Sequence, residues 1–156
     1  MPASVTVTGA DKASRELKQI AIRARRPTPA LKRIGHYLKE ISLQAFRDEA
    51  DPTTGRAWEK LSPLTIERRR NKGKVKILDD IGTLRGSIHH LIIGKQSVAV
   101  GSNLVYAGTH QFGRSQSMGR SGGSRVSIPA RPFLGVDDAG LKEITRMIRR
   151  YLDTGK

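Results

Sequence analysis

A stripe of apolar residues in the first third of the chain constrains the fold more than any other feature of the sequence. Its members recur every three or four positions, as residues on one face of an α-helix do: Leu31, Ile34, Leu38, Ile41, Ala45 and Phe46. Just before the stripe, Thr28 is a favoured N-cap and Pro29 suits the first helical position. We therefore predict a helix from about Thr28 to Asp48 that buries its apolar face against other elements.

The same spacing predicts one helix near each end of the chain. The first follows Asp11 as its cap and stops before Pro27, and its apolar face comprises Ala13, Leu17, Ile20, Ala21 and Ala24. The last starts at Asp137 and Asp138, and its core face comprises Leu141, Ile144, Ile148, Tyr151 and Leu152. Ahead of the first helix, the alternating segment SVTVT at residues 4–8 predicts a short strand.

Shorter elements are predicted between these helices. A turn at residues 51–55 precedes Ser62, which can cap a helix that begins at Pro63 and runs to about Asn71. The remaining expected elements are a helical turn around residues 82–84, strands at residues 87–93 and 97–101, and a helix at residues 103–112. Long amphipathic helices packed on a small antiparallel sheet give an α+β fold class, and the length fits one domain, residues 1–156.

Positive charge dominates the composition. Lys and Arg together number 29 against 14 Asp and Glu, which gives a formal net charge of +15. Such a chain attracts nucleic acid, anionic lipid or an acidic protein, and the charge alone does not select among them. The densest basic run could contact nucleic acid or an acidic partner, although cations also suit a helix C-terminus. It comprises Arg68, Arg69, Arg70, Lys72, Lys74 and Lys76. No segment approaches the ~18 apolar residues of a membrane span, so we expect no membrane partner.

The sequence carries neither a glycine-rich phosphate loop nor a helical His-Glu zinc motif. His89 and His90 are adjacent, and neighbouring residues of a strand point to opposite faces, which disfavours joint metal binding. Asp79 and Asp80 could hold a cation or cap a helix. Because cysteine is absent as well, we expect no catalytic, cofactor-binding or metal-binding residue, no small-molecule substrate and no enzymatic activity. Trp58 can lie in the core or act as an interface hot spot.

Residues 114–127 are almost wholly Ser, Gly and Arg, and they lie between HQFG at 110–113 and IPARPFLG at 128–135. This loop is too polar to bury itself, so we expect it to be flexible in the free protein. Three interpretations stay open. The loop could have no role, could be a nucleic-acid-binding finger, or could become ordered against a neighbouring subunit. Its cations are Arg114, Arg120 and Arg125.

Four short motifs follow one another in the last two thirds of the chain. They are PTTGRAWEKLSPLTIERR at 52–69, ILDDIGTLRGSI at 77–88, VGSNLVYAGTHQFG at 100–113 and IPARPFLG at 128–135. In this order they resemble the phage virion morphogenesis family, the tail completion proteins of Mu-like and P2-like tailed phages. The resemblance extends from about residue 28 to the end. The motif positions are Gly55, Trp58, Leu61, Leu84, Tyr106, His110, Gln111, Phe112, Gly113, Pro129, Arg131, Pro132, Phe133 and Leu134. The family's common ILDTG is ILDDIG here, one residue longer.

The resemblance implies a structural protein of the virion. Members of the family act late in assembly at the head-proximal end of the tail, or neck, where they make the tail competent to join a DNA-filled head. The implied partners are other tail and neck proteins, further copies of the chain in a ring of about six or twelve, and nearby packaged DNA. The implied location is the tail or neck region of the virion, after assembly in the host cytoplasm.

The resemblance also suggests roles for particular residues. Trp58, Leu84 and Phe133 are expected to hold the core. The expected subunit or partner interface comprises Tyr106, His110, Phe112, Arg114, Arg120, Arg125, Arg131 and Phe133. Of these, Tyr106, His110, Phe112 and Arg131 would fix the two ends of the loop. In this hypothesis the loop is an assembly arm whose tip becomes ordered on a partner. The alternative function is a basic module that binds duplex DNA, in which the same cations contact phosphates.

Overall fold

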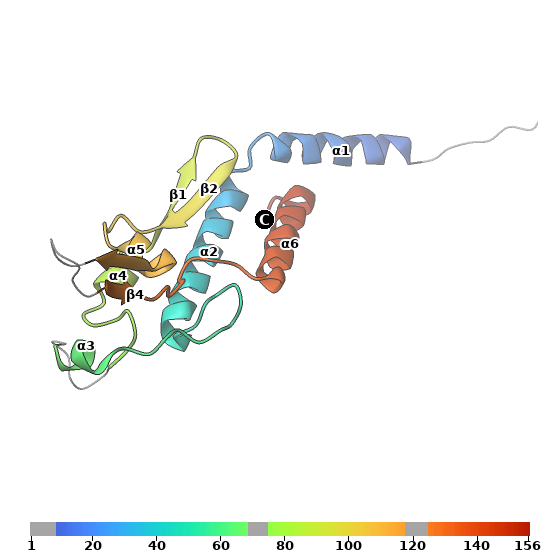
Figure 1. Ribbon diagram of the computed structural model, residues 1–156. Helices are drawn as coiled ribbons and strands as arrows, with labels where there is room; N and C mark the ends of the chain where they lie inside the picture. Colours follow the sequence, from blue (N-terminus) through green and yellow to red (C-terminus); the bar gives the residue numbers. More distant parts are fainter. Residues whose placement is uncertain (1–8, 69–74, 118–124) are drawn as a thin grey trace, which may run out of the picture.

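The computed structural model describes residues 9–68, 75–117 and 125–156, which form a mixed α+β fold (Figure 1). In chain order the elements are α1 (Ala10–Ala24), α2 (Thr28–Asp48), α3 (Pro63–Glu67), α4 (Thr83–Gly86), β1 (His89–Ile93), β2 (Ser97–Gly101), α5 (Ala107–Phe112), β3 (Arg114–Ser117), β4 (Arg125–Ile128) and α6 (Asp138–Thr154). Helices and small two-stranded antiparallel sheets confirm the predicted fold class. The strand predicted at residues 4–8 lies outside the described residues, as do Arg69, Arg70, Lys72, Lys74 and Arg120.

Helix α2 runs through the middle of the molecule, between the β1–β2 hairpin and α6 (Figure 1). Its predicted apolar stripe is confirmed, because Ile34, Ala45 and Phe46 are buried and the other members are half-buried. The predicted end at Asp48 is also confirmed. Thr28 is the first helical residue instead of the cap, because the preceding proline occupies the cap position without a side-chain hydrogen bond.

The β1–β2 hairpin packs on α2 through one of its faces. The strands pair antiparallel, and His90 and Val98 are half-buried on the inner face while Leu91 and Ile93 are exposed on the outer face. Gly35 of α2 permits this close approach. A Cβ atom there would lie 2.7 Å from Cδ2 of His90 and 2.9 Å from Cγ2 of Val98, so a larger residue would push the hairpin away from the helix.

The core is centred on three aromatic side chains from distant parts of the sequence. The ring of Phe46 lies 5.7 Å from that of Trp58 and 5.4 Å from that of Phe133, measured between centroids. Trp58 is 5% exposed, and its Nε1 donates a hydrogen bond to the carbonyl of Pro132 at 2.8 Å. The core positions predicted for Trp58, Leu84 and Phe133 are confirmed, and of the two alternatives for Trp58 the core is correct.

Local capping predictions are confirmed where the side chain itself makes the cap. Ser62 accepts a hydrogen bond from the Thr65 amide and Pro63 is the first residue of α3, as predicted. The turn at residues 51–55 forms around Asp51, whose carboxylate accepts the Thr53 amide at 2.8 Å. These features depend on hydrogen bonds between residues two or three positions apart, so the local sequence is sufficient to specify them.

Element boundaries differ from prediction where a turn replaces regular structure. Helix α3 ends at Glu67 and not near residue 71. Strand β1 begins two residues late because Ser87 still completes α4 through the hydrogen bond from its amide to the Thr83 carbonyl. Helix α5 begins at Ala107 and not at residue 103, because the Ser102 hydroxyl accepts the amide of the following turn and holds it out of the helix.

Helix α6 begins as predicted, but its buried face is narrower than its apolar face. The Asp137 carboxylate caps it by accepting the Gly140 amide at 2.7 Å. Within the helix Gly140 and Tyr151 are buried, whereas Leu141 and Ile148 are 50% and 42% exposed. The predicted core face is therefore wrong at Leu141 and Ile148, since these two side chains lie at its edge and have solvent on one side.

Helix α1 extends away from the body of the molecule and buries none of its residues (Figure 1). Gly9 occupies its cap position, and Asp11 lies in its first turn. Among the described residues, Ile20 is the one half-buried member of the predicted apolar face, and Leu17 is 66% exposed. The helix is held near its end, where the Arg23 guanidinium donates to the carbonyls of Leu152 and Asp153 at 2.6 Å each.

Candidate interaction site at the base of the β3–β4 hairpin

The segment expected to be a flexible loop begins and ends in paired strands. Arg114 lies opposite Ile128 and Ser117 lies opposite Arg125 in an antiparallel ladder. These strands were not expected, because Ser, Gly and Arg show no apolar alternation and the ladder is made by backbone groups. Residues 118–124 between the strands lie outside the described residues, so the flexibility of the loop remains a prediction.

Gln111 joins the upstream end of this hairpin to the segment that follows it. Its Oε1 accepts hydrogen bonds from the amides of Phe133 and Leu134, each at 3.0 Å. Its Nε2 donates to the carbonyl of Leu134 at 2.9 Å. One side chain thus satisfies three backbone groups of a segment without regular structure. Sequence reasoning identified Gln111 as a motif residue but gave it no role, because its partners lie more than twenty residues away.

Arg131 joins the downstream end of the hairpin to the segment around Trp58. Its guanidinium is buried and donates to the carbonyl of Glu59 at 2.8 Å and to that of Lys60 at 3.2 Å. Its own amide donates to the carbonyl of His110 at 2.7 Å. The expected role of Arg131 in fixing the end of the loop therefore has a geometric basis, and its side chain acts from inside the fold.

The hydrogen bonds of Gln111 and Arg131 form a clamp at the base of the hairpin. A cavity of about 430 Å³ lies beside this clamp, bordered by α3, α4, α5, the end of β4 and the residues after it. Tyr106 and His110 line it, with their rings edge to face and 5.9 Å apart. The buried Nδ1 of His110 has no hydrogen-bond partner in the described part of the chain. Burial, and then the positive charge of Arg131, lower the pKa of His110 below its ordinary value, so the ring is neutral at pH 7.

The predicted interface residues divide into two groups. Phe112 is 81% exposed and Tyr106 is 43% exposed, and Arg114 is exposed beside them. In contrast, Phe133 is fully buried and Arg131 nearly so. These two residues would affect a partner indirectly, by holding the exposed residues of the site in position. Arg125 is placed in β4 by its backbone. Contact of any of these residues with a partner stays a prediction. The exposed aromatic side chains are the kind of surface that such contacts use.

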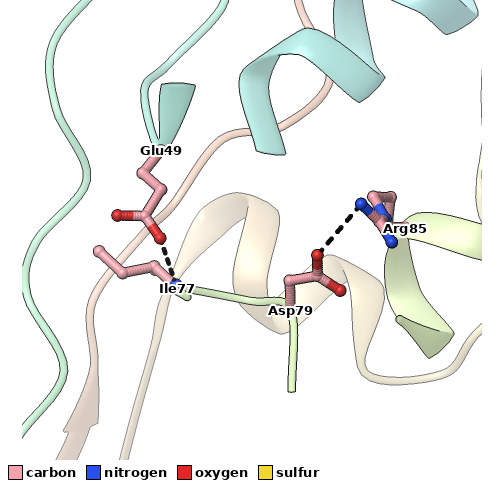
Figure 2. Close-up of polar contacts among 4 residues, drawn as sticks. All are labelled: Glu49, Ile77, Asp79 and Arg85. Carbon is pink, nitrogen blue, oxygen red and sulfur yellow. Dashed lines mark hydrogen bonds and ion pairs between the residues drawn. The ribbon is translucent and has the colours of Figure 1, made fainter. Parts of the chain in front are cut away.

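In the segment before α4, Asp79 forms an ion pair within the protein. Its carboxylate lies 3.3 Å from the Arg85 guanidinium, and nearby the Glu49 carboxylate accepts the Ile77 amide at 2.6 Å (Figure 2). Asp79 therefore has a protein cation as its partner. Gly82, with φ of 80°, occupies the cap position of α4 after the motif that is one residue longer than usual.

The histidine pair is divided between the two faces of β1, as strand geometry requires. His89 Nδ1 lies 2.8 Å from the Ser87 carbonyl, whereas the His90 ring lies 4.4 Å from that of His36. Across the described ranges, no group of three or more His, Asp or Glu side chains is arranged to hold a metal ion. Within the same ranges, no helix combines the length and the apolar character needed to cross a membrane.

The end residues of the basic run are the ones that the structure describes. Arg68 forms the C-cap of α3, and both Arg68 and Lys76 are exposed. The four cations between them lie outside the described residues, so their predicted contact with nucleic acid or an acidic partner stays a prediction.

The folded protein is expected to lose stability as the pH falls below about 6.5. Burial, then the charges of His36, Lys39 and His89, lower the pKa of His90, and burial also lowers that of His110. The unfolded chain, with ordinary histidine pKa values near 6.5, therefore binds more protons than the folded chain. The stabilisation is complete above pH 6.5 and is lost as the pH falls through the lowered pKa values that His90 and His110 have in the folded state.

Urea unfolding at pH 7.5, 6.5 and 5.5 would measure this dependence. We expect the unfolding midpoint to fall across the series and the His90→Gln variant to show a smaller fall, because it removes one of the two groups. His89→Gln is the comparison variant, and it should reduce the fall less than His90→Gln does, because His89 is exposed and is the weakest of the three charges that lower the pKa of His90. A midpoint that does not change between pH 7.5 and 5.5 would contradict the prediction.

Comparison with known proteins gives the site a context. Residues 9–153 match the model of the phage virion morphogenesis family. The chain is 36% identical over 110 residues to the "Putative capsid assembly protein G" of Escherichia phage Mu, an alignment that covers 69% of this chain and 67% of that protein. No solved structure matches.

Proposed function

Since the chain belongs to the phage virion morphogenesis family, and is thereby a virion assembly protein of a tailed phage, we propose that it completes the head-proximal end of the tail. In this role it makes the tail, or the neck, competent to join the head. The name of the Mu relative refers to capsid assembly, which is compatible with a position where capsid and tail meet. The family is one of structural morphogenesis proteins, and the proposed role needs no chemical step.

The observation that carries the proposal is the clamp at the base of the β3–β4 hairpin. Gln111 and Arg131 fix both ends of the hairpin to the buried segment that contains Phe133. Beside this rigid base, Phe112 remains 81% exposed. A rigidly mounted hairpin with an exposed aromatic side chain at its base suits a subunit that docks on another protein, because little order has to be gained at the base on binding.

The proposed partners are other tail and neck proteins and further copies of the chain. A ring of about six or twelve copies around the DNA channel would follow the cyclic symmetry common in such assemblies. Packaged DNA would then lie close to the subunit, and the net charge of +15 would favour that proximity. The proposed location is the tail or neck region of the virion.

The proposal is tested by microscopy of lysates from phage that lack the gene and are complemented with variants. Replacing residues 115–127 with Asn-Gly keeps Arg114 opposite Ile128 and closes the hairpin with a two-residue turn. We expect the shortened protein to fold, with a circular dichroism spectrum like that of the wild type. Lysates that contain it should show filled heads beside unattached tails, whereas the wild-type gene should restore joined particles.

Joined, normal particles in the phage without the gene would contradict the proposal. They would favour the alternative function, a basic module that binds duplex DNA. Joined particles with the shortened hairpin alone would remove the role of the loop but leave the role of the protein intact.

A further inference from the structure

A groove of about 800 Å³ lies between the second half of α2, the turn at residues 50–57 and the first turns of α6. Its apolar lining comes from Tyr37, Ile41, Ala45, Ala57 and Ala139. Its charged lining is Asp48, Asp51, Asp137 and Glu143, and no Lys or Arg among the described residues lines it. In a chain with 29 basic and 14 acidic residues, a groove lined by carboxylates without any cation is a local reversal of charge.

Three of the four groove carboxylates have neutral hydrogen-bond donors as partners in the described part of the chain. Asp48, Asp51 and Asp137 accept hydrogen bonds from neutral side-chain amide, hydroxyl or backbone groups. Such donors orient a carboxylate without cancelling its charge. Glu143 differs, because its Oε2 lies 2.6 Å from the Arg146 guanidinium. The groove therefore combines an apolar lining with negatively charged side chains.

Helix α1 has the complementary chemistry. Its exposed stripe of Ala13, Leu17, Ala21 and Ala24 has no cover in the described part of the chain. Helix α6 lies along one edge of this stripe, where Ile20 and Arg23 of α1 approach Asp153. The remaining exposed positions of α1 carry three cations, Lys12, Arg15 and Lys18, and two acids, Asp11 and Glu16. Lys18 lies next to the apolar stripe, and an amphipathic helix with an excess of cations complements an apolar groove lined by carboxylates.

Helix α1 and the groove contact opposite ends of α6 in a single copy. Arg23 ties α1 to the C-terminal end of α6, whereas Asp137, at the N-terminal end of α6, lines the groove. Helix α6 has 17 residues and is about 25 Å long. While Arg23 holds this position, α1 cannot reach the groove of its own copy.

We propose that α1 of one copy docks in the α2–α6 groove of a second copy. Because two different surfaces meet, the contact is head to tail, and its repetition gives a closed ring or an open filament. Charge complementarity selects this occupant, since it allows a strongly basic chain to bind itself. The contact would supply the ring invoked in the proposed function, but it rests on the groove and on α1 alone.

Light scattering on purified full-length protein after size exclusion, over a range of concentrations, tests the contact. The wild type should form oligomers larger than a dimer, and these should weaken with added salt. Leu17→Asp should weaken association by about tenfold or more, because it removes apolar contact and places a carboxylate against carboxylates. Ile22→Asp is the matched control, since Ile22 is 51% exposed on another side of α1. Neither residue is buried, so both variants should fold.

A second pair of variants tests the groove. Asp48→Lys reverses one groove charge in the last turn of α2, where the helix dipole favours a cation, so the monomer should not be destabilised. It should weaken association as strongly as Leu17→Asp. Glu40→Lys makes the same charge change at an exposed position of α2 outside the groove and should retain the oligomers.

Mixing the two defective variants gives the sharpest outcome. Leu17→Asp keeps an intact groove and Asp48→Lys keeps an intact α1, so their mixture should form dimers that cannot grow. A monomeric wild type, equal loss of association in Ile22→Asp, or a mixture that stays monomeric would each overturn the proposal. These readouts use purified protein, so failure here is distinct from failure of the head–tail joining test.

Discussion

Replacement of Phe133 by alanine is expected to lower the free energy of unfolding by about 3–5 kcal/mol. The Phe133 side chain is 0% exposed and its ring lies 5.4 Å from that of Phe46. Its loss removes apolar contact and leaves a cavity that the surrounding elements can fill only in part. Urea unfolding followed by the fluorescence of Trp58, the single tryptophan, reports directly on this region.

Phe112→Ala is the matched control for this prediction. Phe112 has the same side chain in the neighbouring motif but is 81% exposed, so its truncation should change the free energy of unfolding by no more than about 0.5 kcal/mol. If Phe112 contacts a partner, as proposed, the same variant should impair head–tail joining in the lysate assay. Similar destabilisation by both substitutions would show that Phe133 is not the centre of the core.

Replacement of Gln111 by alanine is expected to lower the free energy of unfolding by about 2–3 kcal/mol. The substitution leaves the amides of Phe133 and Leu134 and one carbonyl without their partner. Each such group costs about 1–3 kcal/mol when water cannot replace the partner, and partial exposure at this site brings the sum down. Urea unfolding measures the global effect.

Hydrogen exchange adds a local readout for the same variant. The amides of Phe133 and Leu134 should exchange faster in Gln111→Ala than in the wild type, because the clamp at the hairpin base has opened. Gln44→Ala is the control, since Gln44 is exposed and its hydrogen bonds reach the exposed Asp48. Unchanged exchange at both amides would mean that the clamp does not hold the segment.

The sequence was sufficient for features specified by neighbours along the chain. The apolar stripe of α2 and the Ser62–Pro63 start of α3 depend on residues within a few positions of one another. Periodicity did not show whether a face would be covered. Leu17 and Ile148 belong to regular apolar stripes, yet both are exposed, because an amphipathic pattern shows which face favours burial and not what buries it.

The site was harder to predict because its contacts are long-range. The motifs HQFG and IPARPFLG were predicted to hold the two ends of the loop, and hydrogen bonds do join these two segments. The fixing role suggested for Arg131 has a basis in its hydrogen bonds. The role of Gln111 and the two strands of the hairpin were missed, since backbone partners far along the chain leave no periodic trace. A polar motif residue directly before Phe112 could have indicated Gln111.

The order in which the chain is synthesised has a consequence for the core. The hydrogen bond between Trp58 and the Pro132 carbonyl spans 74 residues, and Phe133 packs on Phe46, which also contacts Trp58. Contacts so distant require closure of a long loop and form slowly. The aromatic core therefore cannot close until Phe133 has emerged from the ribosome. A fragment that ends before Phe133 lacks this core, so assembly through the folded subunit excludes such fragments.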